Sequence, residues 1–172
     1  MTIRKLTVQD VAELQHISVK TFVDAFGAVN TSEDMELYLA GTFSTERLTE
    51  ELSNSLLRYY FAEVNGEIVA YMKLNLGDTN EEGIPNPSVE LERIYVLASA
   101  QGKAVGQALL DFAKQLATDQ NANYLWLGVW EHNPGAIRFY ERNGFQKFGE
   151  HPFILGKDIQ NDFLMRLEVG RG

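Results

Sequence analysis

The segment from residue 89 to residue 130 constrains the fold of this chain most strongly. Residues 89–97 and 124–130 have the character of sheet strands, and the region 103–118 between them has the spacing of a helix. The apolar side chains of that helix recur at intervals of 3, 1, 3, 1 and 3, in the order Val105, Ala108, Leu109, Phe112, Ala113 and Leu116. Strands that are joined through helices imply a mixed sheet covered on both faces.

The N-terminal part of the chain predicts one strand followed by three helices. Residues 2–6 have the pattern of a short strand. A helix is expected to begin near Thr7, whose capping hydroxyl is followed three residues later by Asp10. Residues 32–40 and 44–55 predict two more helices, each opened by a capping serine. Three helices therefore precede most of the strands.

A β-hairpin is predicted where an Asn-Gly pair at 65–66, the favoured sequence of a tight turn, separates strands at 59–64 and 67–76. A polar loop with two prolines follows at 77–87. Beyond the central segment we expect a short helix and two closing strands, at 134–143, 145–155 and 161–169. The whole order predicts an α/β (α+β) fold, a mixed central sheet of about seven strands flanked by helices, in one domain over residues 1–172.

Composition excludes several kinds of site. The chain contains no cysteine, which rules out disulfides, thiolate metal sites and a covalent acyl-cysteine intermediate. His16, His132 and His151 lack the spacing of a metal site, so no metal is predicted. No apolar run reaches the roughly 18 residues of a membrane span. The first residues lack the apolar stretch of a secretory signal. A cytoplasmic protein without a membrane partner is expected.

The net charge of −9 is unevenly distributed along the chain. Residues 1–100 hold 7 Lys or Arg and 16 Asp or Glu, whereas residues 101–172 hold 8 of each kind. Nucleic acid is not an expected partner, because phosphate binding needs the opposite sign of charge. The acidic half could attract a cationic substrate, or its charge could serve solubility alone, and composition leaves both interpretations open.

The sequence QGKAVG at residues 101–106 lies between the strand at 89–97 and the long helix. Small residues at Gly102, Ala104 and Gly106 let a ligand approach the backbone closely. The first amide N–H groups of a helix have no partner inside it, and together with the helix dipole they make a site for a pyrophosphate. The alternative is a small-residue turn that only packs a helix against a sheet.

A second motif, NPGAIRFYERNGF, covers residues 133–145. Asn133 is suited to cap a helix whose first position is Pro134, and Gly144 is a natural helix stop. Tyr140 lies on the apolar face of this helix. It therefore either fills the core or directs a phenol into a site.

These two motifs together resemble the GNAT superfamily of N-acetyltransferases. Residues 101–106 are similar to its acyl-CoA pyrophosphate loop, Q/R-x-x-G-x-G/A, and residues 133–145 to the block N-x-x-A-x-x-F-Y-x-x-x-G-F. The chain departs from the family at Ala104, where glycine is usual. An alanine with negative φ can still offer its amide to phosphate, so we expect the loop to tolerate alanine less well than glycine without losing its function. The resemblance implies acetyl-CoA as cosubstrate, bound between two splayed strands, with coenzyme contacts from Ile94, Tyr95, Val96, Gln101, Gly102, Lys103, Ala104, Val105, Gly106, Asn133 and Tyr140.

Three further segments, ELSNSLLRYYF (51–61), ELERIYV (90–96) and WLGVWE (126–131), look closest to the PaiA-like branch of the superfamily. That branch is associated with acetylation of polyamines such as spermidine and spermine, so the resemblance implies direct acetyl transfer, in a ternary complex, to a small-molecule primary amine. The alternatives are acetylation of a protein N-terminus or lysine, and a non-catalytic acyl-CoA-binding regulatory module. Many relatives are dimers, so the resemblance also allows a homodimer.

Two glutamates and one tyrosine are the candidate catalytic groups. An alkyl amine with a pKa of roughly 10.4 needs about 4–5 kcal/mol to become neutral at pH 7, so a base is useful. Glu90, Glu92 and Ile94 alternate along one strand, which predicts that they share a face. By resemblance, Glu92 corresponds to the base of some polyamine-acetylating relatives, Glu90 is the second candidate, and Tyr140 is the general acid. The alternative for each glutamate is a solvated strand position.

The acceptor pocket is expected between the first three helices and the loop at 77–87. Trp126 and Trp130 face one way in their strand, and core packing is the expected role of both. Most charged runs are solvated faces, but seven acidic residues of these segments are candidates for binding a second ammonium group of a polyamine: Asp24, Glu33, Asp34, Glu36, Asp78, Glu81 and Glu82.

Overall fold

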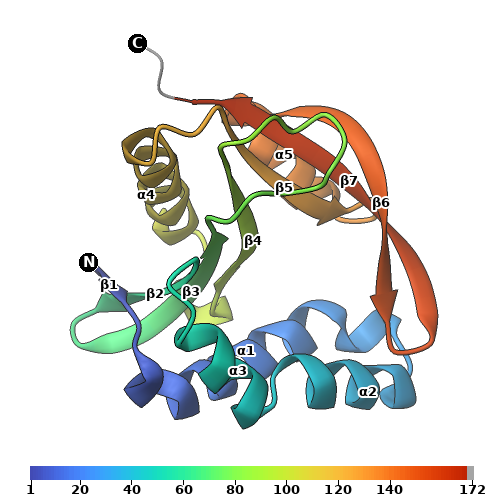
Figure 1. The fold of residues 1–172 in the computed structure, drawn as a ribbon. Coiled ribbons are helices and arrows are strands. Elements are labelled where there is room, and N and C mark those ends of the chain that lie inside the picture. Colours follow the sequence, from blue (N-terminus) through green and yellow to red (C-terminus); the bar gives the residue numbers. More distant parts are fainter. Residues whose placement is uncertain (170–172) are drawn as a thin grey trace.

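The computed structural model describes residues 1–169, whose centre is a seven-stranded sheet with the order β1-β2-β3-β4-β5-β7-β6 (Figure 1). Neighbouring strands are antiparallel except β4 and β5, which are parallel. The predicted mixed sheet of about seven strands is therefore confirmed. The strands are β1 (Thr2–Lys5), β2 (Leu57–Val64), β3 (Glu67–Asn75), β4 (Ser88–Val96), β5 (Tyr124–Trp130), β6 (Gln146–Leu155) and β7 (Asp158–Glu168).

Helices cover both faces of this sheet, as predicted. The first three helices pack on one face around Phe22, Phe43 and Leu48. The last two pack on the other face around Leu109 and Tyr140. Removal of these apolar side chains from water is the main stabilising contribution to such a fold. Within residues 1–169 the α-helices are α1 (Val11–Phe26), α2 (Ser32–Thr42), α3 (Thr45–Leu52), α4 (Val105–Asp119) and α5 (Pro134–Arg142).

Helix α4 begins at Val105, two residues after the predicted start at 103. Gly102 and Ala104 have φ angles of 76° and 63°, in the left-handed region that a right-handed helix does not include. The turn before α4 is therefore a separate loop, whose backbone amides lie directly at the helix N-terminus.

The two central strands diverge along their length. β4 and β5 pair only through Ser88–Glu90 and Tyr124–Trp126. Beyond those residues β5 continues to pair with β7 on its other side, and β4 continues to pair with β3. A gap therefore opens in the middle of the sheet toward the carboxyl ends of β4 and β5, which confirms the predicted splay (Figure 1).

A β-bulge changes which side chains of β4 share a face. Lys73 pairs with Arg93 and Leu74 pairs with Leu91, so Glu92 is an extra residue in the β3–β4 ladder. Ile94 packs in the core beneath α4, together with Leu91. The prediction that Ile94 shares a face with Glu90 and Glu92 is wrong, because the bulge shifts the two-residue alternation by one position.

The β6–β7 hairpin extends down to α2, far away in the sequence (Figure 1). At its tip the Lys157 amide donates to Oδ1 of Asp34 at 2.8 Å, and the Lys157 ammonium pairs with Glu33 at 2.9 Å. Gly156 lies so close to Asp34 that a Cβ there would be 2.5 Å from the Asp34 Cα. This contact positions the hairpin opposite the first helices, on the face of the sheet that carries Glu90.

Candidate functional site

A cavity of about 870 Å³ lies between α4, α5 and the end of β4. Ten of the eleven predicted coenzyme-binding residues line it: Ile94, Tyr95, Val96, Gln101, Gly102, Ala104, Val105, Gly106, Asn133 and Tyr140. The eleventh, Lys103, is exposed and does not line this cavity. We call this space the cofactor cavity.

The backbone of the loop before α4 is shaped to bind an anion. Left-handed residues that alternate with ordinary ones turn successive amide N–H groups toward one side, which makes an anion-binding concavity. Gly102 and Ala104 supply those left-handed positions, and the free first-turn amides of α4 lie next to them. Ala104 does not have the negative φ under which an alanine was expected to offer its amide, because this loop uses the position as its second left-handed residue.

Two polar side chains hold the walls of the cofactor cavity. The Gln101 amide nitrogen donates to the carbonyl oxygen of Val96 at 3.1 Å, which fixes the loop to the end of β4. The Asn133 oxygen accepts from the Ala136 amide at 3.2 Å and caps α5, with Pro134 at the start of the helix as predicted. Both residues therefore position backbone around the cavity.

Tyr140 lies where the cofactor cavity meets the gap between the splayed strands. Its side chain is 7% exposed and packs against Phe139 and Phe145, with ring centroids 5.3 and 5.6 Å away. Burial raises the pKa of the Tyr140 phenol well above its usual value. The phenol is therefore protonated at neutral pH and can act as a proton donor.

The gap between β4 and β5 holds a second cavity of about 430 Å³, which lies between the cofactor cavity and the opposite side of the sheet. It shares Ile94, Asn133 and Tyr140 with the cofactor cavity. On its other side it shares Glu92 and Trp130 with a third cavity of about 490 Å³. The three cavities therefore adjoin one another in series across the sheet, and we call this series the passage.

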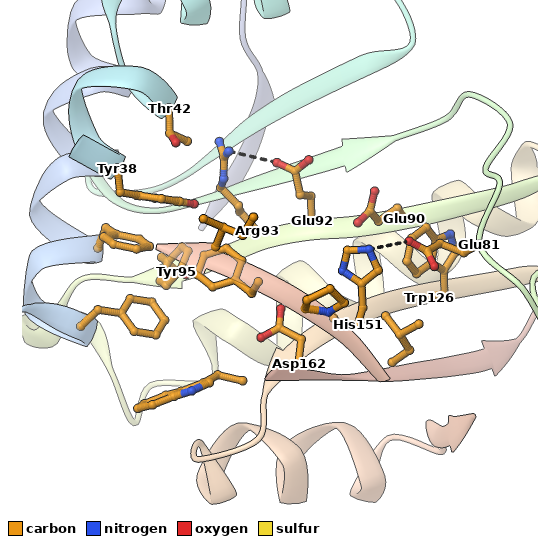
Figure 2. Close-up of a pocket in the computed structure, with 18 of the residues that line it drawn as sticks. Tyr38, Thr42, Glu81, Glu90, Glu92, Arg93, Tyr95, Trp126, His151 and Asp162 are labelled. Carbon is orange, nitrogen blue, oxygen red and sulfur yellow. Dashed lines mark ion pairs between the residues drawn. The ribbon is translucent and has the colours of Figure 1, made fainter. Parts of the chain in front are cut away.

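The third cavity, which we call the acceptor cavity, is assembled from α1, α2, α3, the loop at 77–87 and β4–β7 (Figure 2). The prediction of the first three helices and that loop omitted the β6–β7 hairpin, which supplies a whole wall. Aromatic rings from α1, α2 and the strands surround a group of charged side chains. The rings belong to Phe22, Phe26, Tyr38, Tyr95, Trp126, Trp130 and Phe153.

Glu90 lines the acceptor cavity and accepts a hydrogen bond from the Asn75 amide nitrogen at 2.9 Å. Burial, reinforced by the negative charge of Glu92, raises the pKa of Glu90 to about 7. A carboxyl group with that pKa exchanges protons at neutral pH, which suits a general base.

Glu92, two residues away, has the opposite electrostatic environment. Its carboxylate pairs with the Lys73 ammonium at 2.8 Å and the Arg93 guanidinium at 3.1 Å, and its side chain is 31% exposed to the cavities. Burial opposes ionisation of Glu92, but the charges of Arg93 and Lys73 outweigh it and lower its pKa below the usual value. Glu92 is therefore a stable anion and a weak base.

A buried ion network beneath Glu92 was missed by the sequence predictions. Lys73 is 3% exposed and bridges Glu92 to Glu51, with a distance of 2.8 Å to each carboxylate. Glu51 also accepts from the Tyr59 hydroxyl at 2.6 Å and pairs with Arg47 at 2.9 Å. Burial opposes ionisation of Glu51, but these partners lower its pKa to about 2. A lysine inside the otherwise apolar strand 68–74 was the available sequence signal.

The other acidic candidates are distributed unevenly. Glu81 lines the acceptor cavity, where its carboxylate lies 3.3 Å from His151, whereas Asp24 lines the cofactor cavity. Glu33 and Asp34 hold the hairpin tip. The remaining three do not line the acceptor cavity: Glu36, Asp78 and Glu82.

The two tryptophans combine packing with a place in the site. Trp126 is buried against Ile84 and Leu164, as a core role predicts, and Trp130 is partly buried. Both also line the acceptor cavity, which that prediction did not include. Asp162 of β7 lines the same cavity and was not predicted at all.

Two absences concern only residues 1–169. None of their helices is both long and apolar enough to pass through a membrane. No three His, Cys, Asp or Glu side chains in this part of the chain form a group suited to a metal ion.

Comparison with known proteins adds three findings. Residues 17–145 match the model of the Acetyltransferase (GNAT) family. An uncharacterized N-acetyltransferase of Lactobacillus delbrueckii subsp. lactis is 38% identical over 162 residues, 94% of each protein. A spermidine N(1)-acetyltransferase of Thermoplasma acidophilum is 24% identical over 84% of this chain and 87% of its own length.

Among solved structures, the PaiA N-acetyltransferase from Thermoplasma acidophilum, in complex with coenzyme A, is similar in fold. The TM-score is 0.77 with 21% identity, over 98% of this chain and 99% of that one. At that identity the likeness shows a shared fold.

Proposed function

The chain belongs to the GNAT family of acetyltransferases, and on that premise we propose that it acetylates a primary amine of a polyamine such as spermidine or spermine. The observation that carries this proposal is the passage across the sheet. It leads from an anion-binding loop, past a buried phenol, to an aromatic cavity that contains a carboxyl group with a pKa of about 7.

The cofactor cavity fits acetyl-CoA, which supplies a thioester as the acetyl donor. Amides of the 101–106 loop would bind its diphosphate, as free N–H groups at helix starts do. β4 lacks a strand partner on its β5 side beyond Glu90, so the backbone groups of Ile94–Val96 on that side, apart from the Val96 carbonyl that Gln101 binds, could hold the pantetheine arm as an added strand. The arm would then lead to Tyr140.

Glu90 is assigned as the base in preference to Glu92. An ammonium group must lose a proton before its nitrogen can attack, at a free-energy cost of about 4–5 kcal/mol at pH 7. Glu90 can take that proton near neutral pH, because its pKa is about 7. Glu92 is held ionised by Lys73 and Arg93, so its affinity for a proton is low.

The transfer step then balances as follows in atoms and protons. Glu90 accepts the first proton and passes it to solvent. The amine nitrogen bonds to the thioester carbonyl carbon while the carbon–sulfur bond breaks. Tyr140 donates a proton to the leaving sulfur and regains one from the nitrogen that becomes the amide. No acyl-enzyme is needed, in keeping with a chain that contains no cysteine.

A polyamine suits the acceptor cavity better than a peptide. Rings and carboxylates together attract ammonium groups and cover alkyl chains. The hairpin tip is fixed to α2 by Asp34 and Glu33, which holds the β6–β7 wall of the cavity against the first helices and leaves less room for a polypeptide than an unattached hairpin would. The likeness to a spermidine acetyltransferase over 84% of the chain points the same way.

The test is thiol release from acetyl-CoA by purified protein with a panel of acceptors. Spermidine, spermine and 1,4-diaminobutane form one group, and peptides with a free N-terminus or an internal lysine form the other. We expect kcat/KM for the polyamines to exceed that for peptides at least about tenfold. A higher kcat/KM for the peptides would contradict the polyamine proposal and favour acetylation of proteins. Tight acetyl-CoA binding without turnover of any acceptor would favour a binding module.

A further inference from the structure

Asp162 enters the acceptor cavity from β7, across from Glu92 and Arg93 on β4 (Figure 2). Its carboxylate lies over Gly128 of β5, where an added Cβ would be 3.3 Å from Oδ2. Because Gly128 has no side chain, the carboxylate can occupy space that would otherwise be filled by a neighbouring strand residue.

Within the described residues, the Asp162 carboxylate has no side-chain hydrogen bond and no ion pair. His151, its neighbour across the β6–β7 ladder, directs Nε2 to Glu81 at 3.3 Å. Both arginines of the cavity have other partners, since Arg47 pairs with Glu51 and Arg93 with Glu92. Burial raises the pKa of Asp162 to about 6 and outweighs the opposing effect of the nearby His151.

Aromatic rings line the same part of the cavity. Phe26 and Trp130 form an edge-to-face pair with centroids 5.8 Å apart, and Tyr38 lies 5.6 Å from Phe153. All four of these residues line the acceptor cavity together with Asp162. Aromatic faces attract cations, and they also cover the methylene groups of an alkylamine.

The position of Asp162 relative to Glu90 sets the distance between the two carboxyl groups. Glu90 pairs with Trp126 in the β4–β5 ladder, and the Asp162 carboxylate lies at Gly128, two residues farther along β5. Two residues of a strand span roughly 7 Å, and neighbouring strands lie roughly 5 Å apart, so the separation of the two carboxyl groups is of the order that a short diamine spans.

We propose that Asp162 binds the second ammonium group of a diamine or polyamine whose first amino group is at Glu90. Asp162 would then determine specificity for acceptors with two charged nitrogens over monoamines of equal length. This inference rests on the proposed amine acetylation and adds the residue that selects among amines.

The test compares 1,4-diaminobutane with n-butylamine, which has the same carbon chain and only one nitrogen. The measured quantity is the ratio of kcat/KM for the diamine to kcat/KM for the monoamine. We expect Asp162→Asn to lower this ratio at least about tenfold. Glu168→Gln is the matched control, because it removes one carboxylate from an exposed position of the same strand and should leave the ratio unchanged.

A second variant protects the test against misfolding of the first. Gly128→Ala keeps the Asp162 carboxylate but forces it to move, and should lower the same ratio about threefold or more. A ratio that stays within twofold of the wild type in folded Asp162→Asn overturns the inference, and so does an equal fall in Glu168→Gln. If the wild-type protein acetylates peptides but neither amine, the proposed function fails along with the inference. If the wild-type protein acetylates the amines but Asp162→Asn leaves the ratio unchanged, only the role of Asp162 is overturned and the proposed function stands.

Discussion

The two ends of the passage present different kinds of chemical group. At the cofactor end the candidate anion-binding groups are backbone amides, presented by one loop and two helix starts within residues 94–106 and 133–140. The acceptor end consists of side chains from α1–α3, one loop and four strands. Backbone sites tolerate changes of side chain, whereas a site made of charged side chains depends on every partner. We therefore expect substitutions to have larger effects at the acceptor end than at the cofactor end.

The same contrast occurs within one strand of the acceptor end. Glu90 and Glu92 are two residues apart, yet the pKa of Glu90 is raised to about 7 and that of Glu92 is lowered. The bulge brings Glu92 to Lys73 and Arg93, while Glu90 has a neutral partner in Asn75. Their positions in the sequence do not distinguish these two glutamates. Their different partners in the structure do, and those partners give them different roles.

The largest effect is expected from Glu90→Gln at the acceptor end. Loss of the base should lower kcat/KM for a polyamine by about 10²–10⁴. In the wild type Glu90 becomes protonated as the pH falls through about 7, so the base is lost below that value and present above it. Log kcat/KM should then have a slope near 2 below pH 7, from the amine and Glu90 together, and near 1 above it. The variant should keep a slope near 1 throughout.

The control for this profile is Glu82→Gln, at an exposed loop position outside the acceptor cavity. It should keep the change of slope near pH 7. If Glu90→Gln keeps that change while Glu92→Gln loses it, the assignment of the base is reversed.

The next largest effect is expected from Lys73→Met. Removing this ammonium leaves the Glu51 and Glu92 carboxylates without the cation that joins them, and breaking a buried ion pair on one side costs about 3–5 kcal/mol. Denaturant unfolding at pH 7 measures the lost free energy of unfolding. Lys20→Met, which removes an exposed pair of 3.9 Å with Asp24, should change it by less than about 1 kcal/mol.

The double variant Lys73→Met/Glu51→Gln sharpens the result. It removes one carboxylate together with the ammonium and should recover part of the lost stability. A loss below about 1 kcal/mol in Lys73→Met alone would mean that the network does not hold the acceptor end together.

The cofactor end could be predicted from sequence because its determinants are local. Residues 101–106 and 133–145 each carry their turn, cap and helix start within one short motif, and ten of the eleven predicted residues line the cavity. The exception, Lys103, is in the middle of the motif between the two left-handed residues, but it is exposed and does not line the cavity.

The acceptor end could be predicted only in part because its contacts are distant in sequence. Lys73 contacts Glu51, and Asp162 lies over Gly128, pairings that follow from strand order and register. No periodicity in the sequence predicts the bulge that places Ile94 on the other face of the sheet. The role of the β6–β7 hairpin was missed for the same reason.

A smaller effect is expected from Tyr140→Phe, at the junction of the two ends. Loss of the proton donor should lower kcat at least about tenfold, while affinity for acetyl-CoA changes little because the ring remains in place. Stopped-flow turnover and calorimetric titration measure the two quantities separately. Tyr60→Phe removes a hydroxyl from another buried tyrosine, which lines none of the three cavities, and should keep full kcat. An unchanged rate in Tyr140→Phe would leave the leaving sulfur to be protonated by solvent.

The smallest effect is expected from Ala104→Gly at the cofactor end. An alanine with φ of 63° is strained, whereas glycine adopts this conformation freely, so the free energy of unfolding should rise by about 0.5–1 kcal/mol. That corresponds to an increase in Tm of roughly 1–4 °C for a chain of this size. Ala108→Gly, in the ordinary helical backbone of α4, should lower stability by about 1 kcal/mol. Because the site presents amides, the affinity of Ala104→Gly for acetyl-CoA should stay within about threefold of the wild type. A large loss of affinity would show that the Ala104 methyl group fixes the loop, and the cofactor end would then depend on a side chain as the acceptor end does.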